Sequence, residues 1–310
     1  MKIAILDDYQ NVVPQLACFG LLKDHEVLIV NRTEKDVEKL ALQLKDVEIL
    51  VLIRERTKIT EALLCLLPKL KLISQTGKIA RHIDITACEK YGVKVLEGVG
   101  SPIAPAELTW ALLMNVVRRI PQAIEGMKAG KWQVNIGNTV YGKTLGIWGY
   151  GKIGRRVAQY AKAFGAKVMI WGSDQARQSA LEDGFEAAPS KQYFFERADI
   201  ISLHLRLTDD NLGIVTASDL LMMKEGAALI NTARAELIEE GSLKYVLEQG
   251  KNLWFGLDVF EAEPIYDKGN FLISHPQVIC TPHLGYVEMN SYELYFGKAF
   301  ENVLRYIEEL

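Results

Sequence analysis

Hydrophobic and polar positions along the first third of the chain predict strands and helices in turn. Short apolar runs of strand type alternate with stretches whose apolar residues recur at helical spacing. The predicted strands are Lys2–Leu6, Val27–Val30, Val47–Ile53, Lys71–Ser74 and Val93–Leu96. Helices are predicted between them, including Glu34–Leu44 and Ile83–Tyr91. Such alternation predicts a mostly parallel sheet with helices on both faces.

A second alternating region begins near Thr144. Leu145–Trp148 is an apolar run of strand type, Gly165 ends the helical pattern after it, and Lys167–Trp171 is the next strand. The helical pattern places four residues on one face: Val157, Tyr160, Ala161 and Phe164. Further strands are predicted at Ile200–Leu203, Ala227–Ile230, Phe255–Leu257 and Val278–Cys280. The whole chain is therefore predicted to be α/β.

The segment between the two regions carries a predicted helix with almost no polar face. Pro102 and Pro105 suit the entry to a helix, which is predicted from about Ala106 to Arg119. A helix that is apolar all round is usually buried between layers, domains or subunits. Core packing is the simpler interpretation of this helix, and a dimer interface is the second.

A glycine-rich turn joins the strand Leu145–Trp148 to its helix. Gly149, Gly151 and Gly154 have G-x-G-x-x-G spacing, where the glycines serve a tight turn, close approach of a pyrophosphate and close helix–strand packing. A tight structural turn would also use glycines, but the strand–turn–helix context favours dinucleotide binding at the positive end of the helix dipole. The candidate contacts are Gly149, Tyr150, Gly151, Lys152, Ile153 and Gly154. The first region has Asp7 and Asp8 after its first strand, which would repel a pyrophosphate, so it is the better candidate for holding substrate or covering the cleft.

Composition and charge narrow the class of protein. A length of 310 residues suits about two domains, and 49% apolar with 24% charged residues is typical of a soluble globular protein. A net charge of −3 with dispersed Lys and Arg argues against nucleic-acid binding. The first ten residues lack the pattern of a signal peptide, so none is expected there, and the apolar segment Leu108–Val117 is too short to span a bilayer. The four cysteines lack metal-site spacing and are interpreted as buried, reduced thiols of a cytoplasmic protein.

Polar residues follow four consecutive predicted strands of the second region. They are His204, Asn231–Arg234, Asp258 and Thr281–His283. Open α/β sheets bind ligands outside the carboxyl ends of their strands, so these groups are expected at the edge that holds the glycine-rich turn.

The segments NTARAELIEEGSL, DVFEAEP and TPHLG, together with GYGKIG, resemble signature segments of the NAD(P)-dependent D-2-hydroxyacid dehydrogenases. That family includes phosphoglycerate dehydrogenase and glyoxylate/hydroxypyruvate reductases. The resemblance implies two Rossmann-like, doubly wound parallel-sheet domains with a cleft between them. Residues 1–100 plus 287–310 would bind substrate, residues 101–286 would bind the dinucleotide, and a C-terminal helix, Tyr292–Glu309, would return to the first domain. It also implies a homodimer.

The same resemblance implies a catalytic trio of Arg234, Glu263 and His283. Reduction of a 2-keto acid needs a hydride and a proton, and an imidazole can deliver the proton near neutral pH. Glu263 would favour the imidazolium and orient it, and Arg234 offers a planar fork for a carboxylate and the keto oxygen. Singly, each residue has a structural explanation; together, in matching motifs, they favour catalysis.

Further contacts follow from position in the resembling segments. The candidate cofactor contacts are His204, Thr208, Thr232, Ala233, Asp258 and Gly285. Gly77, Lys78 and Ile79 match the loop for the substrate carboxylate, although Ile79 stands where the family has a second glycine. The backbone N–H groups of Lys78 and Ile79 are expected to bind a carboxylate, and Lys78 is either an added attraction for an acidic substrate or a solvated lysine.

The choice between NAD and NADP depends on the residues after the strand Lys167–Trp171. NAD-specific members carry Asp there for the ribose 2′-OH, and this chain has Gly172, Ser173 and Asp174. Ser173 with Arg177 would suit a 2′-phosphate, whereas Asp174 would suit the ribose; we expect NAD by a narrow margin.

Two other functions stay open. One is a cofactor-binding regulator of the same superfamily. The other is a formate-dehydrogenase-like activity, against which Glu263 argues because that chemistry pairs the histidine with Gln.

Overall fold

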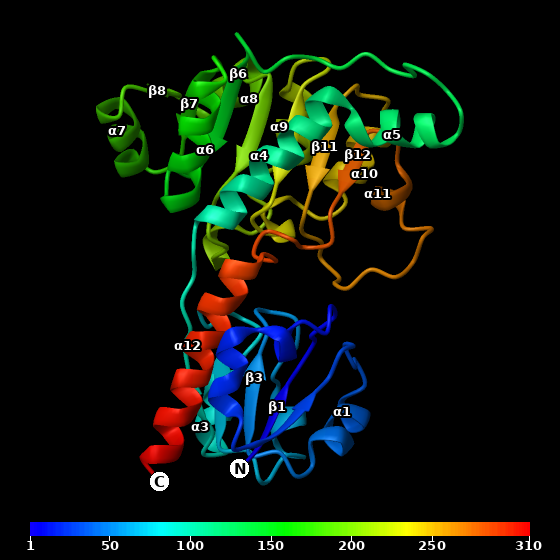
Figure 1. Ribbon diagram of the computed structural model, residues 1–310. Helices are drawn as coiled ribbons and strands as arrows, with labels where there is room; N and C mark the ends of the chain where they lie inside the picture. The colour runs from blue at the N-terminus through cyan, green and yellow to red at the C-terminus, as the bar shows by residue number, and fades with distance from the viewer. The chain divides into compact units, whose positions relative to one another are not determined.

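The computed structural model describes residues 1–310, which divide into two compact units. One comprises Met1–Ser101 and Val287–Leu310, and the other comprises Pro102–Tyr286. Each unit is built on a parallel sheet covered by helices (Figure 1). The predicted class of two parallel-sheet α/β domains is confirmed.

The sheet of the unit Met1–Ser101 with Val287–Leu310 has five parallel strands in the order β2-β1-β3-β4-β5. The strands are β1 Lys2–Ile5, β2 Glu26–Ile29, β3 Ile49–Leu52, β4 Leu72–Gln75 and β5 Lys94–Leu96. Period-2 alternation divides their side chains between two faces, and Ala4, Leu50 and Ile73 lie in the core beneath the helices. The central strand β3 is buried along its whole length and entirely apolar, as expected for a strand covered on both faces, whereas the edge strands β2 and β5 are partly exposed.

Helices cover both faces of this sheet. One core contains residues of α1 Val37–Leu44, α2 Glu61–Leu64 and α3 Ile85–Lys90. The C-terminal helix α12, Met289–Glu308, packs against β4 and β3, and Ser74 Oγ donates to the carbonyl of Ala299 at 2.9 Å. Two short 3-10 helices, Val13–Gln15 and Ala17–Leu22, complete the unit, and Glu293 of α12 accepts the N–H of Ala17 at 2.6 Å.

The unit Pro102–Tyr286 has seven parallel strands in the order β12-β11-β10-β9-β6-β7-β8. The strands are β6 Thr144–Trp148, β7 Lys167–Trp171, β8 Glu186–Ala187, β9 Ile200–Leu203, β10 Ala228–Asn231, β11 Trp254–Leu257 and β12 Val278–Cys280. The strand order reverses between β6 and β9, because the chain runs to one side of β6 first and to the other side afterwards. A doubly wound sheet binds its ligand at this point of reversal.

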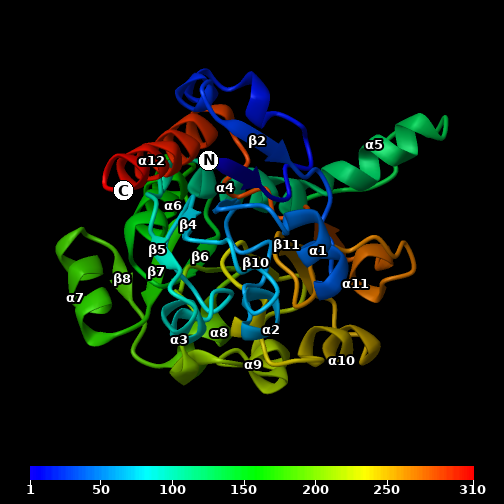
Figure 2. The same cartoon turned by 90° about the horizontal axis from the view of Figure 1, so that it is seen from below.

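Two hydrophobic cores lie on the two faces of the seven-stranded sheet. One core contains residues of α8 Lys191–Arg197, α9 Ala217–Met222 and α10 Ser242–Glu248, with Phe194 and Phe195 fully buried. The other contains residues of α4 Ile103–Arg118, α6 Lys152–Ala163 and α7 Asp174–Glu182. The helix expected between the regions is thus α4, and it packs on β10, β11 and α6 as core. Figure 2 shows α5, Ile120–Lys128, projecting outward, and none of its residues is buried. The short α11, Phe271–Ser274, precedes β12.

Some helix boundaries and side-chain environments in the structure differ from those predicted from the sequence. The first helix begins at Val37 because the Asp36 carboxylate accepts the N–H groups of Glu38 and Lys39. Phe164 lies beyond the end of α6, is 48% exposed, and packs on Trp110 instead of continuing the buried face. The cysteines are all free, but Cys65 is exposed, so the expectation of four buried thiols was wrong. No helix combines the length and apolar character that a bilayer span requires.

Candidate functional site

The glycine-rich turn between β6 and α6 has the shape that its spacing predicts. Gly149 adopts φ +100°, and a Cβ there would lie 2.7 Å from the carbonyl oxygen of His204. A Cβ on Gly154 would lie 2.1 Å from the carbonyl oxygen of Gly149, so only glycine lets α6 pack this closely. A Cβ on Gly151 would meet nothing within 4 Å. The turn is therefore closed on the protein side and open beside Gly151, which fits the approach of a dinucleotide phosphate.

Tyr150 has a structural task within this turn. Its side chain is 6% exposed, and its hydroxyl donates to Asp183 at 2.7 Å. Burial raises the pKa of the Tyr150 hydroxyl further above its ordinary value, with the Asp183 carboxylate adding to the effect. A contact from Tyr150 to a dinucleotide would thus come from its backbone, and Lys152 and Ile153 begin α6 beside it.

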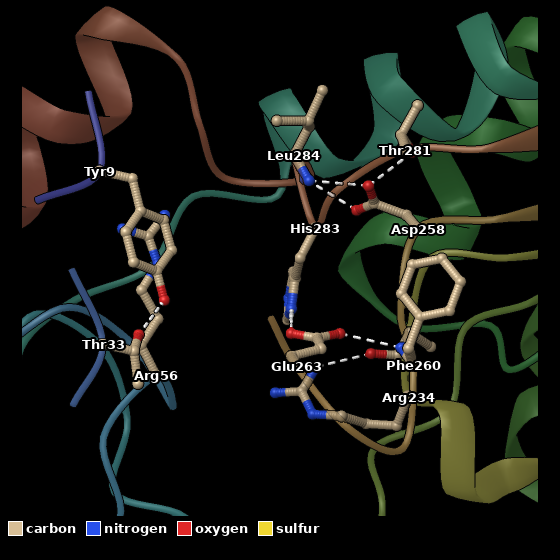
Figure 3. A network of polar contacts seen from close by, with 12 residues as sticks. Tyr9, Thr33, Arg56, Arg234, Asp258, Phe260, Glu263, Thr281, His283 and Leu284 are labelled. Atoms are coloured by element: carbon tan, nitrogen blue, oxygen red, sulfur yellow. Dashed lines mark hydrogen bonds and ion pairs between the residues drawn. The ribbon is translucent and has the colours of Figure 1, made fainter. Parts of the chain in front are cut away.

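His283 and Glu263 form a hydrogen-bonded pair after β12 and β11. His283 Nδ1 lies 2.6 Å from Glu263 Oε2, and Glu263 Oε1 accepts the N–H of Phe260 at 2.9 Å (Figure 3). Both side chains are about one-third exposed or less. The carboxylate is held by backbone, so it fixes the orientation of the ring and leaves Nε2 on the far side of the imidazole. His283 itself has φ +52°, which turns the chain sharply at this residue.

Asp258 fixes the loop that carries His283. It is fully buried at the end of β11, and its carboxylate accepts the Thr281 hydroxyl at 2.6 Å and the N–H groups of Leu284 at 2.7 Å and Gly285 at 2.9 Å (Figure 3). Burial raises the pKa of Asp258, against the lowering effect of these three hydrogen bonds and of His283. The carboxylate is thus occupied within the chain on both oxygens.

Arg234 follows β10, and Asn231 shapes the turn that precedes it. The Asn231 amide donates to the carbonyl of Arg234 at 2.8 Å and accepts the N–H of Ala233 at 3.0 Å. Arg234 Nη1 donates to the carbonyl of Ala233 at 2.6 Å, and Figure 3 shows its guanidinium extending toward Glu263 and His283. The side chains of the expected trio therefore come from three strand ends of one unit and point toward one region.

Three other expected cofactor contacts have partners inside the unit. Thr232 shares a hydrogen bond of 2.6 Å with Thr109 of α4. His204 Nε2 lies 2.9 Å from Ser202 Oγ, and burial lowers the pKa of His204 to about 4, so the ring is neutral at pH 7. Thr208 caps the 3-10 helix Asp209–Asn211, and its N–H donates to Asn211 at 2.8 Å. This capping role explains the presence of Thr208 at this position without a bound ligand.

The residues after β7 carry an ion pair between a partly buried arginine and an exposed aspartate. Gly172 follows the strand, Ser173 caps α7, and Asp174 forms an ion pair with Arg177 one helical turn on. The Arg177 guanidinium lies 5.0 Å from the centre of the Trp171 ring, and its Nε is buried without a partner. The two charges that would decide between a ribose and its 2′-phosphate are thus paired with each other.

The loop after β4 differs from the expectation for a carboxylate site. The Glu97 carboxylate accepts the N–H of Ile79 at 3.0 Å and forms an ion pair with Lys78 Nζ at 2.5 Å. Gly77 is buried, and a Cβ there would overlap the Arg54 guanidinium, which lies 2.1 Å away. A carboxylate of the chain thus holds both the Ile79 N–H and Lys78, and binding of a substrate carboxylate by this loop stays a prediction.

Sequence reasoning missed the roles of Glu97 and Thr109. Glu97 lies beyond β5 and reaches the loop after β4 because these strands are neighbours. Thr109 faces Thr232 across the contact of α4 with β10. A signal for Glu97 was its position directly after a predicted strand, the same signal that identified His204 and Asp258. Thr109 had no such signal, since a threonine in an apolar helix is common.

Comparison with known proteins places this arrangement in a family. The model of the D-isomer specific 2-hydroxyacid dehydrogenase, NAD binding domain, matches residues 110–285. The crystal structure of phosphoglycerate oxidoreductase from Vibrio cholerae O395 is similar over the full length of both chains, with 53% identity and a TM-score of 0.98.

Two curated relatives differ in length. D-3-phosphoglycerate dehydrogenase of Bacillus subtilis is 36% identical over 84% of this chain, and hydroxypyruvate reductase of Thermotoga maritima is 34% identical over 86% of both chains. The chain spans about half the length of the first of these relatives. The agreement with the family model and with these relatives shows that the chain belongs to the D-isomer specific 2-hydroxyacid dehydrogenase family.

Proposed function

We propose that the protein interconverts a small 2-keto acid and its D-2-hydroxy acid with NAD(H) or NADP(H), with His283 as general acid and base. The observation that carries this proposal is the His283–Glu263 pair of 2.6 Å in the unit that also holds the glycine-rich turn. An imidazole whose orientation is fixed by a carboxylate is the arrangement that general acid–base catalysis needs. This pair is the reason to prefer an enzyme.

His283 would move the proton. In the reductive direction Nε2 gives a proton to the keto oxygen, and in the oxidative direction it takes the proton from the hydroxyl. The Glu263 carboxylate accepts from Nδ1–H, which fixes the tautomer and stabilises the ring when it is charged. Such acid–base help is worth roughly 10²–10⁴-fold in rate.

Arg234 would bind and orient the substrate. A guanidinium offers a planar fork of donors to the substrate carboxylate and the carbonyl oxygen. The turn formed by Asn231 and Ala233 holds the backbone of Arg234 in place. Arg234→Lys is expected to weaken substrate binding and orientation more than cofactor binding, because an ammonium cannot reproduce the fork.

The unit Pro102–Tyr286 would hold the cofactor. The open space at Gly151 and the amino end of α6 suit a pyrophosphate, since free N–H groups and the helix dipole favour negative charge there. When bound, a nicotinamide dinucleotide supplies or accepts the hydride. The neutral His204 and the backbone of Thr232, Ala233 and Gly285 are the remaining candidate contacts. The unit with Gly77–Ile79 would hold the substrate carboxylate, once Glu97 has released the loop.

The test is the rate of reduced-cofactor oxidation with glyoxylate, hydroxypyruvate, pyruvate and bulkier 2-keto acids, and the reverse reaction with 3-phosphoglycerate. His283→Ala is expected to lose at least about 10²-fold in kcat while cofactor binding changes little. His25→Ala, a change of the same kind in the other unit, is the matched control. Unchanged turnover in His283→Ala would remove His283 from the mechanism, and no turnover of any acid by the wild type would favour the regulator.

We also propose that the protein forms a homodimer through α5 and the segment after it. The exposed apolar side chains of this part are Ile120, Ile124, Met127, Trp132, Val134, Ile136 and Tyr141. Exposed apolar side chains gathered in one part of the chain support an interaction site there. Light scattering on the purified chain tests the dimer, and Trp132→Ser, at a side chain 78% exposed, is expected to shift the equilibrium toward monomer.

A further inference from the structure

A pocket of about 340 Å³ lies beside the carboxyl ends of β10 and β11. Asn231 and Leu257, the last residues of these two strands, are part of its wall, and α10 and α11 lie next to each other around it (Figure 2). Small-molecule sites have volumes of roughly 300–1,000 Å³, so the pocket is large enough for a ligand. Its wall contains neither the candidate catalytic trio nor the glycine-rich turn, and it contains no residue of the proposed dimer interface. The pocket therefore adjoins the site described above without being part of it.

Apolar side chains make up most of the wall of this pocket. Ile238 and Val259 are buried, whereas Leu243, Phe260 and Phe271 are only partly buried although they pack against the core. An apolar group that covers these three side chains removes their surface and its own from water, which is favourable. The pocket therefore suits a ligand with an apolar ring or chain.

Three carboxylates stand among these apolar side chains. Glu239 and Glu240 belong to the segment after β10, and Glu261 follows β11. The Glu239 carboxylate accepts the Ser242 hydroxyl at 2.9 Å, but Glu240 and Glu261 form no ion pair and no side-chain hydrogen bond within the chain. Partial burial raises the pKa of Glu261, and the carboxylates of Glu240 and Glu236 add to the effect by repulsion. Two loops thus bring unmatched negative charges close together.

The only cation in the wall does not neutralise these carboxylates. Lys244 forms an ion pair at 3.7 Å with Glu248, which lies one turn further along α10 and outside the pocket. A metal ion is a poor fit for the excess negative charge, because no group of three or more His, Cys, Asp or Glu side chains in the chain is arranged to hold one. The wall therefore combines apolar surface with a charge that an organic cation would match.

We propose that this pocket binds a small organic cation, an amine that carries an apolar ring or chain. The ammonium group would lie between Glu240 and Glu261, where its N–H groups donate to both carboxylates and relieve their repulsion. The apolar part would lie against Leu243, Phe260 and Phe271. This inference does not depend on the proposed dehydrogenase activity, because it concerns binding alone.

The experiment is a calorimetric titration of the full chain with benzylamine at neutral pH, where the amine is charged. Sodium chloride holds the ionic strength constant. We expect one saturable site with a dissociation constant on the order of 1 mM, as suits a ligand of this size. Two further ligands separate the contributions: benzyl alcohol keeps the ring without the charge, and methylamine keeps the charge without the ring. Each is expected to bind about tenfold more weakly than benzylamine or worse.

Variants of the wall locate the site. Glu240→Gln and Glu261→Gln are each expected to weaken benzylamine binding about threefold or more, and the double variant about tenfold. Leu243→Asn, which makes the apolar wall polar at similar size, is expected to weaken it severalfold. Glu186→Gln is the matched control, because Glu186 is exposed on β8 at the far edge of the same sheet, and this variant is expected to bind like wild type. The melting temperature checks that each variant is folded, and the two glutamate variants carry the test if Leu243→Asn does not fold.

Four results would overturn the proposal. The first is the absence of saturable binding of benzylamine to wild type. The second is unchanged binding in the double variant of Glu240 and Glu261, which would place the amine elsewhere on the chain. The third is equal weakening in Glu186→Gln, which would indicate non-specific attraction to a negative protein. The fourth is binding of benzyl alcohol or methylamine as strong as that of benzylamine, which would show that the pocket does not recognise the combination of charge and ring.

Discussion

His283 Nδ1 and Glu263 Oε2 lie 2.6 Å apart, and the other oxygen of Glu263 is held by the backbone N–H of Phe260 at 2.9 Å. The carboxylate therefore cannot turn away from the ring without losing a backbone hydrogen bond. An imidazole held in this way has one defined tautomer in its neutral form, with the proton on Nδ1 and the lone pair on Nε2. The hydrogen bond to Glu263 therefore fixes both the orientation of the His283 ring and the nitrogen that carries its proton.

Glu263→Gln is expected to lower kcat by about 10²-fold or more while KM for the cofactor changes little. The amide no longer stabilises a charged imidazole, and its NH₂ group can favour the wrong tautomer. Steady-state kinetics with the best 2-keto acid measures the effect. Glu261→Gln, an exposed carboxylate two residues earlier, is the matched control. A Glu263→Gln enzyme with wild-type kcat would contradict the assigned role.

Asp258→Asn is expected to destabilise the protein by about 2–3 kcal/mol and to lower kcat as well. The native carboxylate accepts the Thr281 hydroxyl and two backbone N–H groups, and an amide can accept on one side only. The loop that carries His283 would then lose hydrogen bonds that hold it in place. Urea unfolding and kinetics measure the two effects, with Asp210→Asn, on an exposed turn, as control. Wild-type stability in Asp258→Asn would argue against this account of the loop.

The sequence pattern predicted the parts of the fold that depend on local order. Strand positions and the glycine-rich turn followed from apolar runs and from a motif in which each glycine has a backbone reason, as the close approach of Gly154 to Gly149 illustrates. The confirmed parallel α/β class followed from the alternation alone. Helix starts were less accurate, because one aspartate side chain, Asp36, determines where the first helix begins.

Contacts between side chains that come from different strands could not be predicted from the sequence. Glu97 holds Ile79 and Lys78 because β4 and β5 lie side by side, and neither pattern nor spacing shows which loop a carboxylate will reach. Asp258 was expected as a cofactor contact, and the sequence did not show that its carboxylate accepts hydrogen bonds from the loop of Leu284 and Gly285. Position at a strand end thus did not show which groups of the chain these residues would contact.

Asp174→Asn is expected to move cofactor preference toward NADPH by about tenfold. Asp174 neutralises Arg177, which stacks near Trp171 at the end of β7, and removing that charge leaves the guanidinium for a 2′-phosphate. Wild type is expected to prefer NADH narrowly. The ratio of kcat/KM for the two reduced cofactors measures both statements. A strong NADPH preference in wild type would show that the expected narrow preference was wrong.

Glu97→Gln is expected to lower KM for a 2-keto acid severalfold with little change in kcat. Glu97 competes with a substrate carboxylate for the N–H of Ile79 and the charge of Lys78, and a neutral amide competes less well. The neutral substitution keeps the side-chain length. Initial rates over a range of acid concentrations measure the change. A raised KM would mean that Glu97 helps to build the substrate site instead of blocking it.

Stability is expected to fall as the pH drops from about 6.5 toward 4, in part because of His204. Burial lowers the pKa of this ring from 6.5 to about 4 in the folded chain, so the unfolded chain binds the proton first. Above pH 6.5 neither state is charged and the ring contributes no pH dependence. Between these two pH values the free energy of unfolding falls, by on the order of 3 kcal/mol at the lower pH. Urea unfolding at several pH values measures the slope, and His204→Gln is expected to flatten it while leaving the pH dependence above pH 7 unchanged. An unaltered slope in that variant would mean that His204 takes up its proton in the folded state as readily as in the unfolded chain.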